Sequence, residues 1–219
     1  MREVKASANK MEQRSTETRA RIVRAAYDLF CAHGFRATTM EAIGTAAGVS
    51  VQTVYFQFRT KNQVLQAVHE WTVLGDEGLP PERQSWYLHA LAHPEAGTLL
   101  AAVVAGTASL NARIAPTLPI FATLAKEPQG DIYRASQRLR RDGMERLAEE
   151  LRARQPLRSG LTSERAADIL DFLIGPESYA ALVLHAGWSA ADWTTWVSDI
   201  LLHQLFDRAR GDEQNTPDE

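Results

Sequence analysis

Apolar residues recur at helical spacing along most of this chain. Near the N-terminus, Ile22, Ala26, Leu29 and Phe30 fall three or four positions apart and share one face of a helix. Gly34 follows them, and glycine is the usual residue just past a helix end. The same period continues through the later segments. The pattern predicts an all-α protein.

Two short helices separated by a glycine turn follow this first helix. Thr38 opens a capping-box sequence for a helix over residues 38–47, and Ser50 caps a helix over residues 51–58. Gly48 lies in the turn between them. Two adjacent caps outweigh the strand preference of the valines and aromatics in the second segment. The arrangement predicts a helix-turn-helix inside an N-terminal three-helix head.

The remaining chain predicts a larger helical body. Thr60 with Gln63 caps a fourth helix that runs through Trp71, and residues 75–84 form a loop. Further helices are expected over 93–114, 119–125, 128–154, 163–185 with a break at Gly175-Pro176, and 190–210. The predicted domains are a flexible basic arm over 1–15, a helix-turn-helix domain over 16–62, a regulatory and dimerisation domain over 63–210, and a disordered acidic tail over 211–219.

Charge is divided unequally along the sequence. Residues 1–70 carry ten Lys and Arg against six Asp and Glu, whereas the rest of the chain carries fourteen against twenty-one. A basic N-terminal part is typical of a nucleic-acid-binding head. The single cysteine, Cys31, excludes an internal disulfide, and the first residues contain no secretory signal. The apolar run 96–110 is too short to span a bilayer. We therefore expect a cytoplasmic protein that does not enter a membrane.

The second helix of the helix-turn-helix carries the candidate DNA contacts. Gln52 can bond an adenine edge and Val51 can pack on a thymine methyl group, because N-terminal residues of such helices enter the major groove. Thr53, Tyr55 and Lys61 suit phosphates. The full set of expected DNA-binding residues is Thr38, Thr39, Ser50, Val51, Gln52, Thr53, Tyr55, Phe56, Gln57 and Lys61.

Residues 18–68 resemble the DNA-binding domain of the TetR/AcrR family of bacterial repressors. That domain typically reads AxxLFxxxGF followed by TTxxxIAxxAGVSxGTLYxYFxSKxxLL, and the matching segments here are AAYDLFCAHGF and TTMEAIGTAAGVSVQTVYFQFRTKNQVL. Gly44 replaces the usual Ala, Gln52 a common Gly and Val54 the usual Leu, while Phe56-Gln57 replaces a Tyr-Tyr or His pairing. Gln52 adds a side chain that can read bases, and the Phe56-Gln57 departure prevents a target sequence from being carried over.

The resemblance implies a helical body with a small-molecule pocket, a homodimer formed through the last two helices, and release from DNA on ligand binding. Two wide apolar stripes also favour a dimer interface, with Ile169, Leu173, Leu182, Trp193, Val197, Ile200, Leu201 and Leu205 as its candidates. Large groups in the body are candidates for the pocket: Trp86, Arg113, Phe121, Tyr133, Phe172 and Tyr179. Both sets also suit an ordinary core.

The sequence therefore predicts a transcriptional regulator, a repressor released from a palindromic operator on double-stranded DNA by an unknown apolar or aromatic effector. An activator, or a DNA-binding protein without ligand control, is the alternative. No cofactor or metal is expected: His89 and His93 have a zinc-like spacing, but no further ligand completes a site. The sequence contains no GxSxG, Walker or GxGxxG motif, so an enzyme is not expected.

Overall fold

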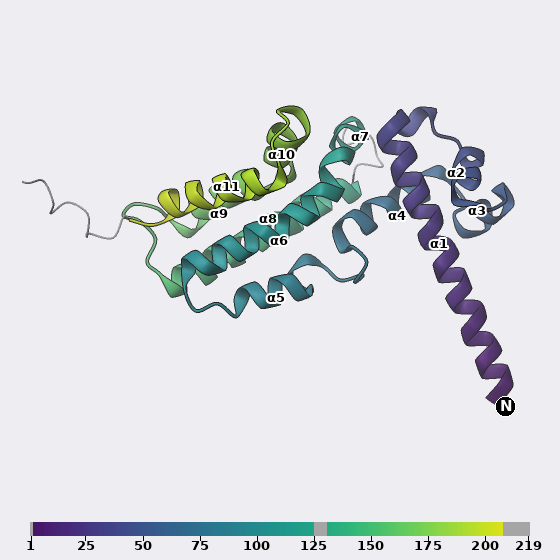
Figure 1. Ribbon diagram of the computed structural model, residues 1–219, viewed down its shortest axis with the longest axis horizontal. Coiled ribbons are helices and arrows are strands. Elements are labelled where there is room, and N and C mark those ends of the chain that lie inside the picture. Colours follow the sequence, from purple (N-terminus) through teal and green to yellow (C-terminus); the bar gives the residue numbers. More distant parts are fainter. Residues whose placement is uncertain (1, 125–130, 208–219) are drawn as a thin grey trace, which may run out of the picture. The chain divides into compact units, whose positions relative to one another are not determined.

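The computed structural model describes residues 2–124 and 131–207, and within these ranges every regular element is a helix (Figure 1). The all-α prediction is therefore confirmed. The elements are α1 (Arg2–Ala37), α2 (Met40–Ala47), α3 (Val51–Gln57), α4 (Lys61–Leu74), η1 (Pro81–Arg83), α5 (Ser85–Leu91), α6 (Ala96–Ile114), η2 (Ala115–Thr117), α7 (Leu118–Leu124), α8 (Asp131–Arg154), α9 (Ser163–Ile174), α10 (Pro176–Tyr179), η4 (Ala180–His185) and α11 (Ala190–Leu205).

The chain divides into two compact units. The first contains Met1–Gly78 together with Pro116–Arg134, and the second contains Leu79–Ala115 together with Ala135–Glu219. A segment from the middle of the chain thus belongs to the same unit as the head. The sequence instead predicted that residues 63–210 form one regulatory and dimerisation domain.

The core of the first unit is built by all three head helices together with α4 and α7. Apolar positions three or four residues apart bring one stripe of each helix inward. The fully buried members include Ile22, Ala26, Phe30, Ile43, Val54, Phe58, Val64 and Val68, and Ile120 and Phe121 from α7 join the same cluster. α7 therefore packs into the head core rather than serving only as a connection.

The first helix is longer than its apolar stripe. Its backbone is helical from Arg2, where the sequence predicts a flexible arm over residues 1–15. Gly34, near its other end, has a φ of 79° and ψ of 164°, which a residue with a side chain rarely adopts. The glycine predicted to end this helix thus leaves the helical conformation. The predicted acidic tail, 211–219, lies outside the described residues.

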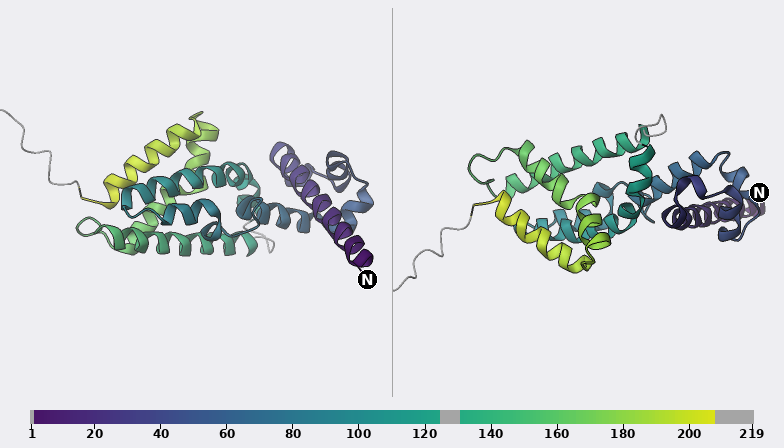
Figure 2. Two further views of the ribbon diagram at one scale, coloured as in Figure 1. Left: turned by 60° about the horizontal axis from the view of Figure 1, so that its bottom comes forward. Right: turned by 90° about the horizontal axis from the view of Figure 1, so that it is seen from above.

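In the second unit, α6 packs against α5 and α11, and α9 packs against α11 (Figure 2). The stretch Ala96–Ala122 is apolar enough by composition to cross a bilayer. Leu99, Leu100 and Val104 on α6 are nevertheless fully buried inside this unit. An apolar helix in this position is a core helix rather than a membrane span.

The predicted break at Gly175-Pro176 is confirmed between α9 and α10. A Cβ atom on Gly175 would lie 2.5 Å from the carbonyl oxygen of Asp171, so only glycine fits this close approach. Arg140 from α8 forms ion pairs with Asp171 and Glu177, each at 2.9 Å, on either side of the break. Charged side chains therefore lie on both sides of this bend.

The last helix corrects part of the predicted dimer interface. Trp193, Val197, Leu201 and Leu205 are fully buried in the core of the second unit, and Leu173 is nearly so. Ile169, Leu182 and Ile200 are half-buried. The wide stripe exists, but its centre packs on α6 and α9 within a single chain, which leaves only its edges for a partner.

Candidate nucleic-acid interface

The turn between α2 and α3 is fixed by caps and by one close contact. Thr39 accepts a hydrogen bond from the Ala42 amide at 3.1 Å, and Gly48 takes the left-handed conformation with a φ of 66°. Ser50 accepts from the Thr53 amide at 3.2 Å, as its predicted role requires. These interactions set the angle at which α3 leaves α2.

Gly44 allows α3 to lie close to α2. A Cβ atom at this position would be 3.1 Å from the carbonyl oxygen of Val49 and 3.3 Å from a methyl group of Val54. Such distances are tighter than ordinary van der Waals contact. The glycine that departs from the family's usual alanine is therefore matched to the narrow space beside Val54.

The outer face of α3 presents side chains that lie outside the buried core of the head. Gln52 is exposed, Tyr55 is 49% exposed and Phe56 is 83% exposed, whereas Val54 on the opposite face is fully buried. Val51 and Thr53 are half-buried at the start of the helix. A large aromatic ring left almost entirely in solvent indicates a binding surface. Gln52, Tyr55 and Phe56 thus share the face predicted to read DNA.

Thr38 does not belong to this face. Its side chain is only 3% exposed, and its hydroxyl donates a hydrogen bond to the Gly34 carbonyl at 2.9 Å. The cap of α2 is Thr39, one residue later than predicted. The contact with DNA predicted for Thr38 is therefore corrected to a structural role at the end of α1, while Thr39 remains exposed.

Lys61 has a structural role that the sequence did not predict. Its ammonium donates to the carbonyl oxygens of Phe35 and Thr38, each at 2.8 Å, and to that of Arg36 at 3.3 Å. It also lies 4.5 Å from the centre of the Phe35 ring. A cation at the C-terminal end of a helix stabilises the unpaired carbonyls there. All three hydrogens of the Lys61 ammonium are therefore used within the protein, and none is left for the phosphate contact that the sequence predicted.

Gln57 connects the recognition helix to α1 rather than pointing freely outward. Its amide nitrogen donates to the Ser15 hydroxyl at 3.0 Å. Close by, the Arg19 guanidinium lies 4.3 Å from the centre of the Phe58 ring. An open groove of about 400 Å³ is lined here by Arg19, Phe56, Gln57, Phe58, Arg59, Gln63, Gln66, Ala67 and Glu70. Sequence reasoning missed Ser15, Arg19 and Arg59 at this site.

The predicted pocket residues are divided between the two units. Phe121 and Tyr133 stack in the first unit with ring centres 5.6 Å apart. Trp86, Arg113, Phe172 and Tyr179 belong to the second unit, where Phe172 is 73% exposed and Tyr179 packs on Trp193 in the core. An exposed Phe172 cannot line a cavity within a single chain. The prediction for that residue is therefore corrected.

His69 is a buried polar group that the sequence did not single out. Its ring centre lies 4.7 Å from that of Phe121 and 6.3 Å from that of Tyr133. Its Nδ1 atom is buried without a hydrogen-bond partner in the described part of the chain, and burial lowers the pKa of the imidazole from its ordinary value. A buried imidazole among aromatic rings thus lies in the contact between α4 and α7.

Known proteins resemble this chain at two levels. The model for bacterial regulatory proteins of the tetR family matches residues 22–68. The HTH-type transcriptional regulator SrpR of Pseudomonas putida is 43% identical over 61 residues, which is 28% of this chain and 29% of the relative. The uncharacterized HTH-type transcriptional regulator TtgW, also of Pseudomonas putida, is 43% identical over 61 residues, or 28% of this chain and 46% of the relative. The match thus spans less than half of either relative.

Solved structures extend the resemblance in fold to most of the chain. The fatty acid degradation regulator FadR of Bacillus halodurans has a TM-score of 0.69 at 16% identity, covering 91% of this chain and 97% of the other. NalD, the secondary repressor of the MexAB-OprM multidrug efflux pump in Pseudomonas aeruginosa, has a TM-score of 0.65 at 22% identity, covering 89% and 100%. A putative regulator from Saccharomonospora viridis, solved with choline, has a TM-score of 0.69 at 18% identity, covering 88% and 100%. At these identities the likeness establishes the fold alone.

Proposed function

We propose that this chain is a TetR-family regulator, a sequence-specific DNA-binding repressor that a small ligand releases from a palindromic operator. The observation that carries the proposal is the outer face of α3. Gln52, Tyr55 and Phe56 are exposed on a short helix whose start is capped by Ser50 and whose opposite side is locked by Val54. A rigid helix that presents an amide and two aromatic side chains suits the edges of bases in the major groove.

A palindromic operator requires two heads, so the active species is a homodimer. Support comes from exposed apolar side chains in the second unit: Phe172 on α9, Leu184 in η4, Trp188 and, on α11, Trp196. The rings of Trp188 and Trp196 meet edge to face with centres 5.8 Å apart. Large apolar groups left in solvent on neighbouring elements of one unit are typical of a surface that a partner covers.

The proposed release by a ligand draws on the names of two structural neighbours and on an aromatic group in the first unit. One structural neighbour of this chain was solved in complex with choline, and another is named as a regulator of fatty acid degradation. In this chain the rings of Phe121 and Tyr133 and the imidazole of His69 form an aromatic group where α7 packs into the head core. A ligand shifts the protein off DNA only if it binds the released conformation more tightly, because equal affinity for both states shifts nothing.

Footprinting on the DNA that flanks the chain's own gene tests this proposal. We expect a protected site with two-fold symmetry, and loss of that protection when a suitable small apolar or aromatic compound is added. The change Gln52→Ala should alter base preference at one or two positions of each half-site, by about 1–3 kcal/mol each. Protection that ignores sequence, or a Gln52→Ala variant with unaltered preference, would contradict the proposal.

A further inference from the structure

The N-terminal half of α1 extends beyond the core that holds the head together. From Met11 onward, where side chains are described, Ile22 is the first buried residue, and residues 11–21 are exposed apart from the half-buried Thr18. The backbone before Ile22 is nevertheless helical from Arg2 onward (Figure 1). At 1.5 Å per residue, this extension is about 30 Å long. None of residues 11–21 belongs to the buried core cluster of the head.

One hydrogen bond fixes where the extension lies relative to the recognition helix. The Gln57 amide at the C-terminal end of α3 donates to the Ser15 hydroxyl at 3.0 Å. The Arg19 guanidinium, one turn further along α1, lies over the Phe58 ring that follows α3. The extension therefore leaves the head beside the end of α3 opposite to Gln52.

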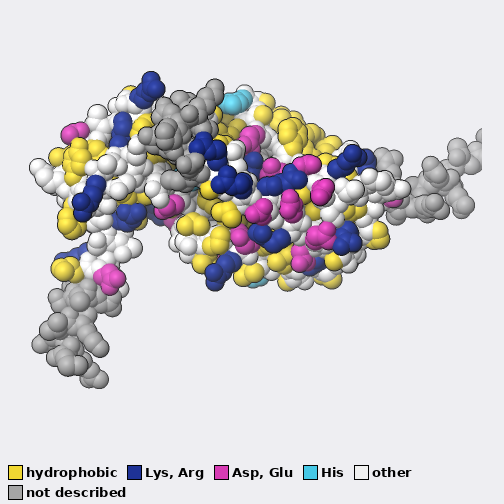
Figure 3. Space-filling view, turned by 180° about the vertical axis from the view of Figure 1, so that it is seen from behind, with side chains coloured by type: hydrophobic (Ala, Val, Ile, Leu, Met, Phe, Trp, Pro, Cys, Tyr) yellow, Lys and Arg dark blue, Asp and Glu magenta, His cyan; other side chains and the backbone are white. Residues whose placement is uncertain are grey.

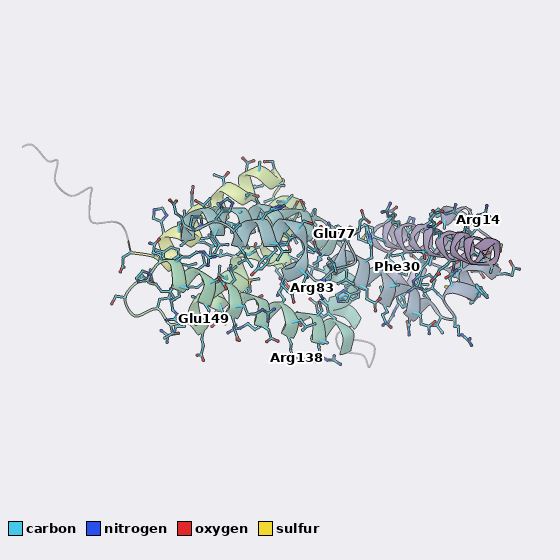
Figure 4. The ribbon with its side chains drawn as sticks, turned by 90° about the horizontal axis from the view of Figure 1, so that it is seen from below. Arg14, Phe30, Glu77, Arg83, Arg138 and Glu149 are labelled. Carbon is cyan, nitrogen blue, oxygen red and sulfur yellow. The ribbon has the colours of Figure 1, made fainter. Side chains whose placement is uncertain are left out.

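The same stretch carries unpaired positive charge. Arg14, labelled on α1 in Figure 4, and Arg21, together with Thr18, Ala20, Arg24 and the acidic Glu17, line an open hollow of about 670 Å³ along α1. Arg24 pairs with Asp76 at 2.7 Å, whereas Arg14 and Arg21 make no ion pair within the part of the chain that the structure describes. The sequence before them adds Arg2, Lys5 and Lys10 against Glu3 and Glu12.

We propose that this part of α1, through Arg14 and Arg21, binds DNA phosphates beside the site that α3 reads. The inference rests on the proposed function, since it assumes that α3 docks in a major groove. A helix held at Ser15 to the end of α3 then runs along the flanking backbone, and its arginines contact phosphates irrespective of base sequence. By contrast, the face of the second unit in Figure 3 intermixes positive and negative side chains.

Salt dependence distinguishes phosphate contacts from other effects. Full-length protein is titrated into a labelled duplex of mixed sequence between about 50 and 200 mM salt, and the slope of log K against log salt is measured. We expect the double variant Arg14→Gln, Arg21→Gln to flatten this slope by about 0.9 for each phosphate that is no longer neutralised, or roughly 2 for each chain. The variant Arg14→Lys, Arg21→Lys should keep the slope, because lysine retains the charge.

Arg83→Gln with Arg138→Gln is the matched control, since it removes the same charge from the exposed surface of the second unit (Figure 4). It should leave the slope as in the wild type. If the wild type binds with a steep slope and both Gln double variants share it, this inference is overturned and the proposed function stands. If the wild type binds no duplex at all, the proposed function itself fails.

Discussion

At the scale of single residues, two phenylalanines in and after α3 have opposite roles. Phe56 is 83% exposed and Phe58 is 2% exposed. We expect Phe56→Ala to leave the free energy of unfolding within about 0.5 kcal/mol, as for other surface changes, and to weaken specific DNA binding by about 1 kcal/mol or more. Phe58→Ala should instead lower the free energy of unfolding by about 3–5 kcal/mol. Denaturant unfolding measures the stability of each variant, and DNA titration measures its affinity. Full DNA affinity in Phe56→Ala would contradict the proposal that the outer face of α3 contacts DNA.

Lys61 illustrates a charge that serves the fold. Lys61→Met keeps the aliphatic stem but removes the ammonium from the carbonyls of Phe35, Arg36 and Thr38. We expect the free energy of unfolding to fall by about 1.5–3 kcal/mol, because the carbonyls no longer have a charged hydrogen-bond donor. Urea denaturation measures this change. Unaltered stability combined with a salt slope reduced by about 1 would restore the phosphate role and contradict the structural one.

Some residue roles could be predicted from the sequence and others could not. The caps at Ser50 and Thr60 could, because each is an isolated hydroxyl residue before a helical period. Thr38 and Thr39 are both suited to a cap, and the choice between them depends on the end of α1, which buries Thr38. The carbonyls that bind Lys61 lie about 25 positions earlier in the chain. No local pattern encodes such a contact.

At the scale of elements, the strongly periodic helices could be predicted and α5 could not. The helices expected over 119–125 and 128–154 occur as α7 and α8. By contrast, Ser85–Leu91 is a single short helix with no side-chain cap, and it follows a proline pair. Its stability comes from packing on α6. Tertiary contact of this kind leaves little trace in local sequence.

Gly106 provides a test of that packing. A Cβ atom on Gly106 in α6 would lie 2.0 Å from the Trp86 ring of α5. Gly106→Ala should displace the ring and lower the free energy of unfolding by about 1–3 kcal/mol, despite the gain of about 1 kcal/mol in helix propensity. Gly97→Ala, in the same helix, meets only a methyl group of Leu202 at 3.4 Å. In thermal unfolding, Gly97→Ala serves as the control and should be as stable as the wild type or more stable. Equal stability of the Gly106→Ala and Gly97→Ala variants would contradict the close packing of Trp86 on Gly106.

At the scale of the whole molecule, the apolar stripe on α11 shows the limit of sequence reasoning. The stripe is wide enough to include both core and surface positions of one helix, but the helical period alone does not show which of its residues face inward. The structure places Leu201 in the core and leaves Phe172 and Trp196 exposed. Similarly, α7 contributes Ile120 and Phe121 to the head core across a long separation in sequence. Long-range packing decides both outcomes.

The oligomeric state can be tested with two substitutions. Phe172→Glu places a charge on an exposed position of α9, so we expect it to dissociate the dimer while each chain stays folded. Leu201→Glu buries a charge in the core and should unfold the chain instead. Sedimentation velocity gives the mass, and circular dichroism the fold. A wild type that is monomeric, or a Phe172→Glu variant as dimeric as the wild type, would contradict this placement of the interface.

The central claim is that the outer face of α3 reads DNA sequence, and selection from a random duplex library tests it most directly. Full-length wild type should enrich a two-fold symmetric motif whose half-sites lie one or more helical turns apart, each turn being about 10 bp. Gln52→Ala should enrich a motif altered at one or two positions in each half-site. Enrichment of no motif by the wild type, or of the same motif by both proteins, would contradict the claim.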